Sequence, residues 1–159
     1  VQEISDETWT QVIDGTLGLK FRCTREVYPY MAKKQKGSII NFGSLYAVGA
    51  PDFRTYEGTE FISPPNYGAG KAAIVQFTRH CASQFAEKGI RVNCISPGSY
   101  PHPKTQEHKI FMDRLANKTM LGRIGMPEDL VGVAVLLASD ASSYITGANY
   151  MVDGGQTAW

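Results

Sequence analysis

Two short apolar runs constrain the fold of this chain more than any other feature of its sequence. Residues 38–42 read Ser-Ile-Ile-Asn-Phe and are strand-like, and residues 90–95 read Ile-Arg-Val-Asn-Cys-Ile. The second run has β-branched residues at alternate positions and is typical of a buried strand in a parallel sheet. Helical patterns alternate with these runs along the chain. The sequence is therefore predicted to form an α/β structure.

Four helices and a third strand complete the predicted order. The helices are expected at residues 6 to about 31, 67–87, 107–117 and 127 to about 139, and the last strand at 150–152. Asp6 is a plausible N-cap for the first helix. In the third, Ile110, Phe111 and Leu115 are predicted to form the apolar side. Lys88-Gly89 is a stop signal for the second helix, and Pro127 suits the first turn of the fourth.

Tyr67 and Lys71 introduce acid/base chemistry on the second predicted helix. Residues four apart on a helix lie on the same face, so both side chains can act on one ligand. A free phenol titrates near ~10 and carries protons poorly at neutral pH, but a neighbouring positive charge favours the phenolate. The pair therefore suits general acid/base catalysis of carbonyl–alcohol interconversion. Alone, Y-x-x-x-K is a weak signal, because both residue types are common on solvated helix faces.

The motifs around this pair make the signal specific. Ser44 comes just after the first strand-like run, Pro97-Gly98 ends the second, and Val-Asp-Gly-Gly stands at 152–155. In this order and at these spacings the chain resembles the short-chain dehydrogenase/reductase family. The resemblance rests on Ser44 with Tyr67 and Lys71, the R-V-N-C-I-S-P-G segment from Arg91, the L-G-R-I-G-M-P-E-D-L segment from Leu121, and the V-D-G-G ending. It covers nearly the whole chain.

The resemblance implies an NAD- or NADP-dependent oxidoreductase on a doubly wound, Rossmann-type parallel sheet. Tyr67 would exchange a proton with the substrate oxygen, and Lys71 would bind the nicotinamide ribose hydroxyls. Ser44 would hydrogen-bond the substrate oxygen as charge develops there. Hydride would pass directly between the nicotinamide and the substrate carbon. Further cofactor contacts would come from the loop after the second strand, at Pro97, Gly98 and Tyr100.

The glycine-rich turn that cradles the dinucleotide phosphates in that family has no counterpart here. Gly15 and Gly18 lie in a helical pattern and do not fit G-x-x-x-G-x-G after a strand. Residues 1–159 are therefore expected to be a single partial domain, the C-terminal part of a Rossmann-type domain, with about 100 family residues absent before Val1. Either the protein itself is a fragment, or this sequence records only part of a longer polypeptide. The second reading is favoured, because half a parallel sheet would leave an unpaired edge.

An inserted segment at residues 51–61 lies beside the expected reaction centre. Ser44 and Tyr67 are 23 positions apart, a longer gap than is usual in the family. Within the insertion, Arg54 is a candidate to pair bidentately with a substrate carboxylate or phosphate, and Tyr56 to stack on or hydrogen-bond a sugar. The alternative is a surface excursion that packs on itself or on a neighbouring subunit.

The composition argues against several other classes of function. A net charge of +1 gives no reason to propose nucleic acid or a membrane surface as partner, and no apolar run approaches the ~20 residues of a bilayer span. Cys23, Cys81 and Cys94 lack metal-type spacing, so no metal site is expected. The three cysteines are instead expected to be buried free thiols in a cytoplasmic protein. In similar proteins the 67–87 helix contributes to a subunit interface, which implies a homo-oligomer, a dimer or a tetramer.

Three hypotheses about function stay open at this point. The insertion and the V-D-G-G-Q-T-A-W ending look like members acting on sugars, sugar acids or nucleotide-linked sugars, which favours a carbohydrate-derived small-molecule substrate. A 3-oxoacyl-carrier-protein reductase would suit the segment from Leu121, but the insertion counts against it. A non-catalytic remnant is favoured by the missing glycine-rich turn and by Thr16, which falls where many members carry an asparagine that anchors a water relay. Intact Ser44, Tyr67 and Lys71 argue against that last reading.

Overall fold

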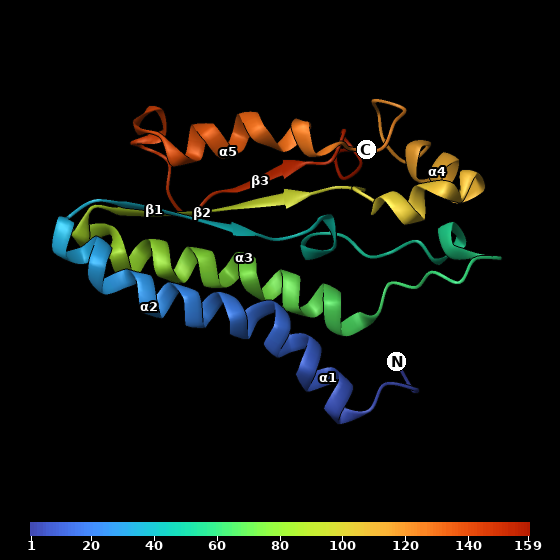
Figure 1. Ribbon diagram of the computed structural model, residues 1–159, viewed down its shortest axis with the longest axis horizontal. Helices are drawn as coiled ribbons and strands as arrows, with labels where there is room; N and C mark the ends of the chain where they lie inside the picture. Colours follow the sequence, from blue (N-terminus) through green and yellow to red (C-terminus); the bar gives the residue numbers. More distant parts are fainter.

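A parallel sheet of three strands organises the structure, with helices on both faces (Figure 1). The computed structural model describes residues 1–159. Strands β1 (Gly37–Phe42), β2 (Ile90–Pro97) and β3 (Asn149–Val152) lie in the order β1-β2-β3. Apolar side chains of β2 are fully buried, as expected for a central parallel strand. The predicted α/β class and all three predicted strands are confirmed.

The first predicted helix is a continuous rod that contains a π-helical turn. Helix α1 (Asp6–Ile13) passes through the π-turn Asp14–Gly18 into α2 (Leu19–Lys34). The predicted N-cap is wrong by one residue, because the Ser5 hydroxyl accepts the hydrogen bond from the Thr8 backbone N–H at 3.2 Å. Asp6 instead lies in the first turn, where its negative charge suits the positive helix end.

Helix α3 (Pro65–Phe85) packs with α2 beneath the sheet (Figure 1). Phe85 is buried and its ring lies 4.5 Å from that of Tyr28 on α2. Burying a side chain of this size contributes roughly 1.5–3 kcal/mol. The 3-10 turn Ala86–Lys88 follows, and Gly89 reverses the chain with a φ of +65°, as the stop signal predicted. Cys81 and Cys94 are buried, but Cys23 is exposed, so the expectation of a buried thiol is wrong there.

Helix α5 (Val131–Ala138) covers the opposite face of the sheet (Figure 1). It follows a 3-10 turn, Pro127–Leu130, that begins at the predicted proline. Two side chains from the strands hold its C-terminal end: the Ser38 hydroxyl and the Arg91 guanidinium both donate to the Leu137 carbonyl, at 2.7 and 3.0 Å. Leu137 itself is fully buried.

Helix α4 (Lys109–Ala116) lies beyond the carboxyl ends of the strands, after the 3-10 turn Pro103–Glu107. Phe111 and Leu115 are buried, as predicted. Ile110 is 71% exposed, so its prediction as an apolar-side residue is wrong. Residues one apart on a helix do not face the same way, and only the 111/115 pair, four apart, turns inward.

No helix of the chain combines the length and the apolar character that crossing a bilayer requires.

Candidate functional site

Ser44 and Tyr67 line the same cavity, of about 250 Å³, at the carboxyl edge of the sheet. Ser44 follows β1 after one glycine, and Tyr67 lies in the first turn of α3. Gly98 and Tyr100 reach this cavity from the loop after β2. Because β1 and β2 are parallel, the loops that follow them leave the sheet at the same edge. The fold thus brings together residues that are far apart in the sequence.

The Ser44 hydroxyl is oriented by its own backbone. It caps the 3-10 turn Leu45–Ala47, and its oxygen accepts a hydrogen bond from the Tyr46 backbone N–H at 3.1 Å. The residue is buried. Because the bond uses a lone pair, the hydroxyl proton remains free to be donated to a ligand oxygen in the cavity.

The Lys71 ammonium is held between the end of β1 and the Tyr67 ring. It donates to the Phe42 carbonyl at 3.0 Å and lies 5.6 Å from the centroid of that ring. Burial, with a smaller effect from the charge of Lys20, lowers the pKa of Lys71. An ammonium has three donors, so two remain for another acceptor.

The loop after β2 approaches the C-terminal segment so closely that only glycine fits. A Cβ on Gly98 would lie 2.5 Å from the Asp153 Cα, a backbone atom that cannot swing aside. The Gly98 N–H donates to the Val152 carbonyl at 3.0 Å. The buried Asp153 carboxylate in turn accepts from the Thr157 hydroxyl at 2.6 Å. The V-D-G-G motif therefore acts here as a structural brace beneath Pro97-Gly98.

The structure places the two predicted substrate residues of the insertion differently. Tyr56 lines the cavity, and its ring lies 5.6 Å from that of Phe111 on α4. The Arg54 side chain is 83% exposed, does not line the cavity, and pairs with Asp52 through Nε at 2.9 Å. Asp52 caps the same 3-10 turn, Phe53–Tyr56, and occupies the guanidinium fork. Arg54 is therefore not brought to the reaction centre.

Tyr46 is a cavity residue that the sequence reasoning missed. Its hydroxyl lies 2.6 Å from that of Tyr56, and its ring lines the cavity with Ser44 and Tyr67. Burial, and next the hydrogen bond with Tyr56, raises the pKa of Tyr46 well above its ordinary value. The available signal was its position two residues after Ser44, at the carboxyl edge where ligands bind in parallel sheets.

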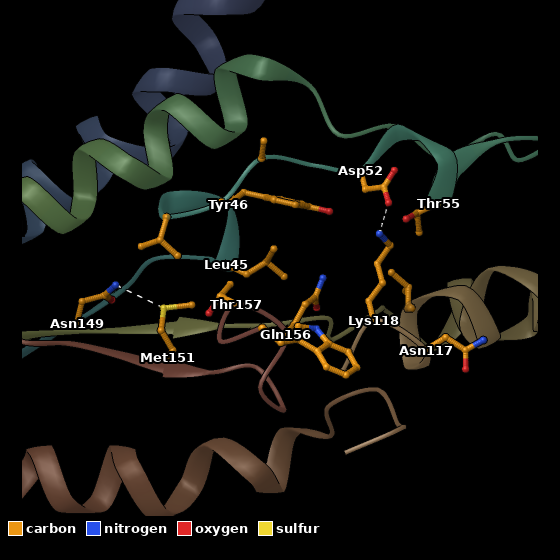
Figure 2. A pocket seen from close by; sticks show the side chains of 15 residues that line it. Leu45, Tyr46, Asp52, Thr55, Asn117, Lys118, Asn149, Met151, Gln156 and Thr157 are labelled. Carbon is orange, nitrogen blue, oxygen red and sulfur yellow. Dashed lines mark hydrogen bonds and ion pairs between the residues drawn. The ribbon is translucent and has the colours of Figure 1, made fainter. Parts of the chain in front are cut away.

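A second, larger cavity of about 650 Å³ shares Leu45, Tyr46 and Leu115 with the first (Figure 2). The loop after β1, the residues that follow α4, and the C-terminal segment form its walls. Figure 2 shows Lys118 reaching across to Asp52, with which it forms an ion pair. This pair ties the insertion to the α4 segment.

Thr16 faces α3 from the π-turn. Its hydroxyl donates to the Val12 carbonyl at 2.7 Å, and Oγ1 lies against Gly70 of α3. The hydroxyl proton is thus satisfied within its own helix.

Comparisons with known proteins agree with this architecture. The family model described as Enoyl-(Acyl carrier protein) reductase matches residues 1–157. A 3-oxoacyl-[acyl-carrier-protein] reductase of Chlamydia trachomatis is 37% identical in an alignment that covers 98% of this chain and 59% of the relative. A 2-dehydro-3-deoxy-D-gluconate 5-dehydrogenase of Pseudoalteromonas atlantica is 39% identical in an alignment that covers 96% of this chain and 58% of the relative.

A solved structure gives the same picture in three dimensions. The short chain dehydrogenase of Leptospira borgpetersenii with bound NAD+ superposes with a TM-score of 0.87 at 38% identity, over 98% of this chain and 59% of that one. The chain thus spans about three-fifths of the length of the relatives that it matches. This likeness confirms the Rossmann-type parallel sheet. Together with the match over residues 1–157, it shows that the chain belongs to the short-chain dehydrogenase/reductase family.

Proposed function

We propose that this chain forms the catalytic and substrate-binding part of an NAD- or NADP-dependent oxidoreductase, within one Rossmann-type domain. The observation that carries the proposal is the cavity at the carboxyl edge of the sheet. Ser44 and Tyr67 both line it, and the Lys71 ammonium is fixed 5.6 Å from the Tyr67 ring. A phenol, a hydroxyl and a cation around one small space suit carbonyl–alcohol interconversion.

The residues present fit the nicotinamide end of the cofactor. Two N–H donors of Lys71 remain after its bond to Phe42, which suits the ribose hydroxyls. Pro97 ends β2, and Gly98 and Tyr100 of the loop that follows line the cavity. When bound, the nicotinamide supplies or accepts the hydride. In the oxidation direction Tyr67 takes the proton of the substrate hydroxyl, and Ser44 donates a hydrogen bond to the same oxygen.

Within this activity we propose a polar, carbohydrate-derived substrate. The 39% identity to a 2-dehydro-3-deoxy-D-gluconate 5-dehydrogenase supports it, as does the pair of tyrosine hydroxyls in the cavity wall. A 3-oxoacyl-carrier-protein reductase is the second candidate, favoured by the 37% identity to such an enzyme. Turnover of acetoacetyl thioester, compared with turnover of sugars, separates the two.

We further propose that the protein is a cytoplasmic homo-oligomer, a dimer or a tetramer. Apolar side chains of the α1–α2 rod support an interface there, because Trp9, Leu19, Phe21 and Tyr30 are all exposed. Light scattering of the full-length protein after gel filtration tests the oligomeric state, and a monomer across the micromolar range would refute it.

The test of the function is Tyr67→Phe in the full-length protein, with two measurements. Nicotinamide fluorescence should show that the variant binds NADH or NADPH in the micromolar range, roughly −8 kcal/mol, as the wild type does. Turnover should fall by about 10²–10⁴-fold, because the proton-transfer group is lost. Tyr144→Phe, at a fully exposed tyrosine outside the cavity and the proposed interface, is the matched control and should change neither quantity. Full activity of Tyr67→Phe would refute the assignment.

A further inference from the structure

The walls of the cavity beside Ser44 and Tyr67 carry no charged side chain. They combine hydroxyl groups, among them those of Tyr46 and Tyr56, with apolar rings such as Phe61 and Phe111. An ionised carboxylate that enters such a space without a paired cation loses its hydration and gains no compensating charge. The walls therefore favour an uncharged molecule.

Three cations of the insertion and the α4 segment are already engaged elsewhere. Arg54 and Lys118 both pair with Asp52. Arg114 donates to the backbone carbonyls of Thr55 and Glu57. Each of these bonds holds the insertion in place, so releasing a cation to meet a substrate would loosen the wall itself.

His108 and Lys71 do not supply the missing charge either. His108 lies edge-on to the Phe61 ring at 4.9 Å, outside the lining, with Glu60 3.8 Å from its Nε2. The Lys71 ammonium is held at the Phe42 carbonyl and does not line the cavity.

Tyr46 and Tyr56 present a fixed, neutral hydrogen-bonding pair to this space. Their hydroxyl oxygens are 2.6 Å apart, so one phenol donates to the other and the pair keeps one O–H proton for a ligand. A phenol is protonated at neutral pH, and burial raises the pKa of Tyr46 still further from that range. The Tyr56 ring is packed on Phe111, and the Tyr46 hydroxyl is held by its hydrogen bond with Tyr56.

Building on the proposed function, we propose that Tyr46 and Tyr56 are specificity-determining residues that bind a second oxygen of an uncharged, monosaccharide-sized polyol or cyclic ketol. In this assignment the hydroxyl under reaction meets Ser44 and Tyr67, and a neighbouring hydroxyl meets the tyrosine pair. A sugar acid, which carries a carboxylate into the same space, is selected against, so in this assignment the chain differs in substrate charge from the relative named for 2-dehydro-3-deoxy-D-gluconate. A cavity of about 250 Å³ suits a molecule of this size.

The assignment is tested with matched pairs of substrates on the full-length enzyme. Each pair joins a hexitol to the hexonate of the same configuration, so the two compounds differ only in charge and oxidation at one end. With saturating NAD or NADP, the kcat/KM of the neutral member should exceed that of the acid by about 10–100-fold. Equal values, or a preference for the acids, would overturn the assignment.

Two variants then examine the tyrosine pair itself. Tyr56→Phe removes one hydrogen bond and should raise the KM of the neutral substrate about 5–10-fold, with kcat within about twofold. Tyr144→Phe, a fully exposed tyrosine, is the matched control and should change nothing. Thr105→Lys adds a cation to the cavity wall, where the threonine hydroxyl makes no hydrogen bond, and should shift preference toward the acid about tenfold. A loss of kcat at constant KM in Tyr56→Phe would show a merely structural role.

Titration calorimetry separates failure of this inference from failure of the proposed function. It measures binding of each pair to the full-length Tyr67→Phe protein with NADH or NADPH, and it needs no turnover. Preferential binding of the neutral compounds supports the tyrosine pair even if the wild type proves inactive. Preferential binding of the acids, or binding of neither class, overturns it even if the enzyme is an active oxidoreductase.

Discussion

Replacing Gly70 by alanine should destabilise the protein, although alanine is the better helix former. Gly70 lies in α3 between Tyr67 and Lys71 and faces the π-turn. A Cβ at this position would lie 2.1 Å from the Thr16 Oγ1 and 3.0 Å from its Cβ. The Thr16 hydroxyl is held by the Val12 carbonyl at 2.7 Å, so making room means breaking that bond or moving the rod away from α3.

Two opposing contributions set the size of the effect. Alanine in a helix is favoured over glycine by about 1 kcal/mol, whereas overpacking a close contact costs about 1–3 kcal/mol. Because 2.1 Å is far inside van der Waals contact, the cost should fall in the upper part of that range. The net loss in the free energy of unfolding should then be about 1–2 kcal/mol. Gly132→Ala in α5, where a Cβ would meet nothing within 4 Å, is the matched control and should gain about 0.5–1 kcal/mol.

Urea unfolding of the full-length protein measures both variants. Adding Thr16→Ala to Gly70→Ala removes the closest contact, so the double variant should recover part of the loss, with a coupling energy of about 0.5–2 kcal/mol. The reasoning is refuted if Gly70→Ala is as stable as Gly132→Ala, or if the two substitutions are additive.

Two further predictions concern the ion pair before α5 and the contact between α4 and the insertion. The hydrogen-bonded Arg123 guanidinium lowers the pKa of Asp129 to about 2 from 3.8. The stability from this pair is therefore complete above pH 3.8 and is lost as the pH falls toward about 2. The difference in unfolding free energy between wild type and Asp129→Asn should shrink across that window. A difference that stays constant with pH would contradict the prediction. Arg114→Ala removes the bonds to the Thr55 and Glu57 carbonyls, and hydrogen exchange of the insertion amides should become about tenfold faster. Unchanged protection would show that Arg114 does not hold the insertion.

The elements with strong local signals were predictable from the sequence. The β-branched run of β2, the stop at Gly89 and the proline start at Pro127 all depend on residues next to one another in the chain. The π-turn at 14–18 was not predictable, because no periodicity marks it and its Thr16 packs against Gly70, more than fifty residues away in the sequence. Such a contact is decided by tertiary packing.

The candidate site divides in the same way. Ser44, Tyr67 and Lys71 were found from motif spacing, and the structure places the first two in one cavity with the third beside them. The role of Tyr46 depends on the path of the insertion, which brings the Tyr56 hydroxyl to it. The conformational preferences of single residues do not predict this contact between the two hydroxyls. Arg54 was predicted to bind a substrate anion, but the carboxylate of Asp52, two residues earlier, binds its guanidinium instead.

The attachment of the insertion to α4 has a consequence for enzyme engineering. Asp52 binds Lys118, and the carbonyls at Thr55 and Glu57 bind Arg114. A loop grafted alone into a relative would arrive without these partners and would have no defined shape. Residues 51–61 and 109–118 therefore form one structural unit, and a graft of the insertion into another family member calls for moving both segments together.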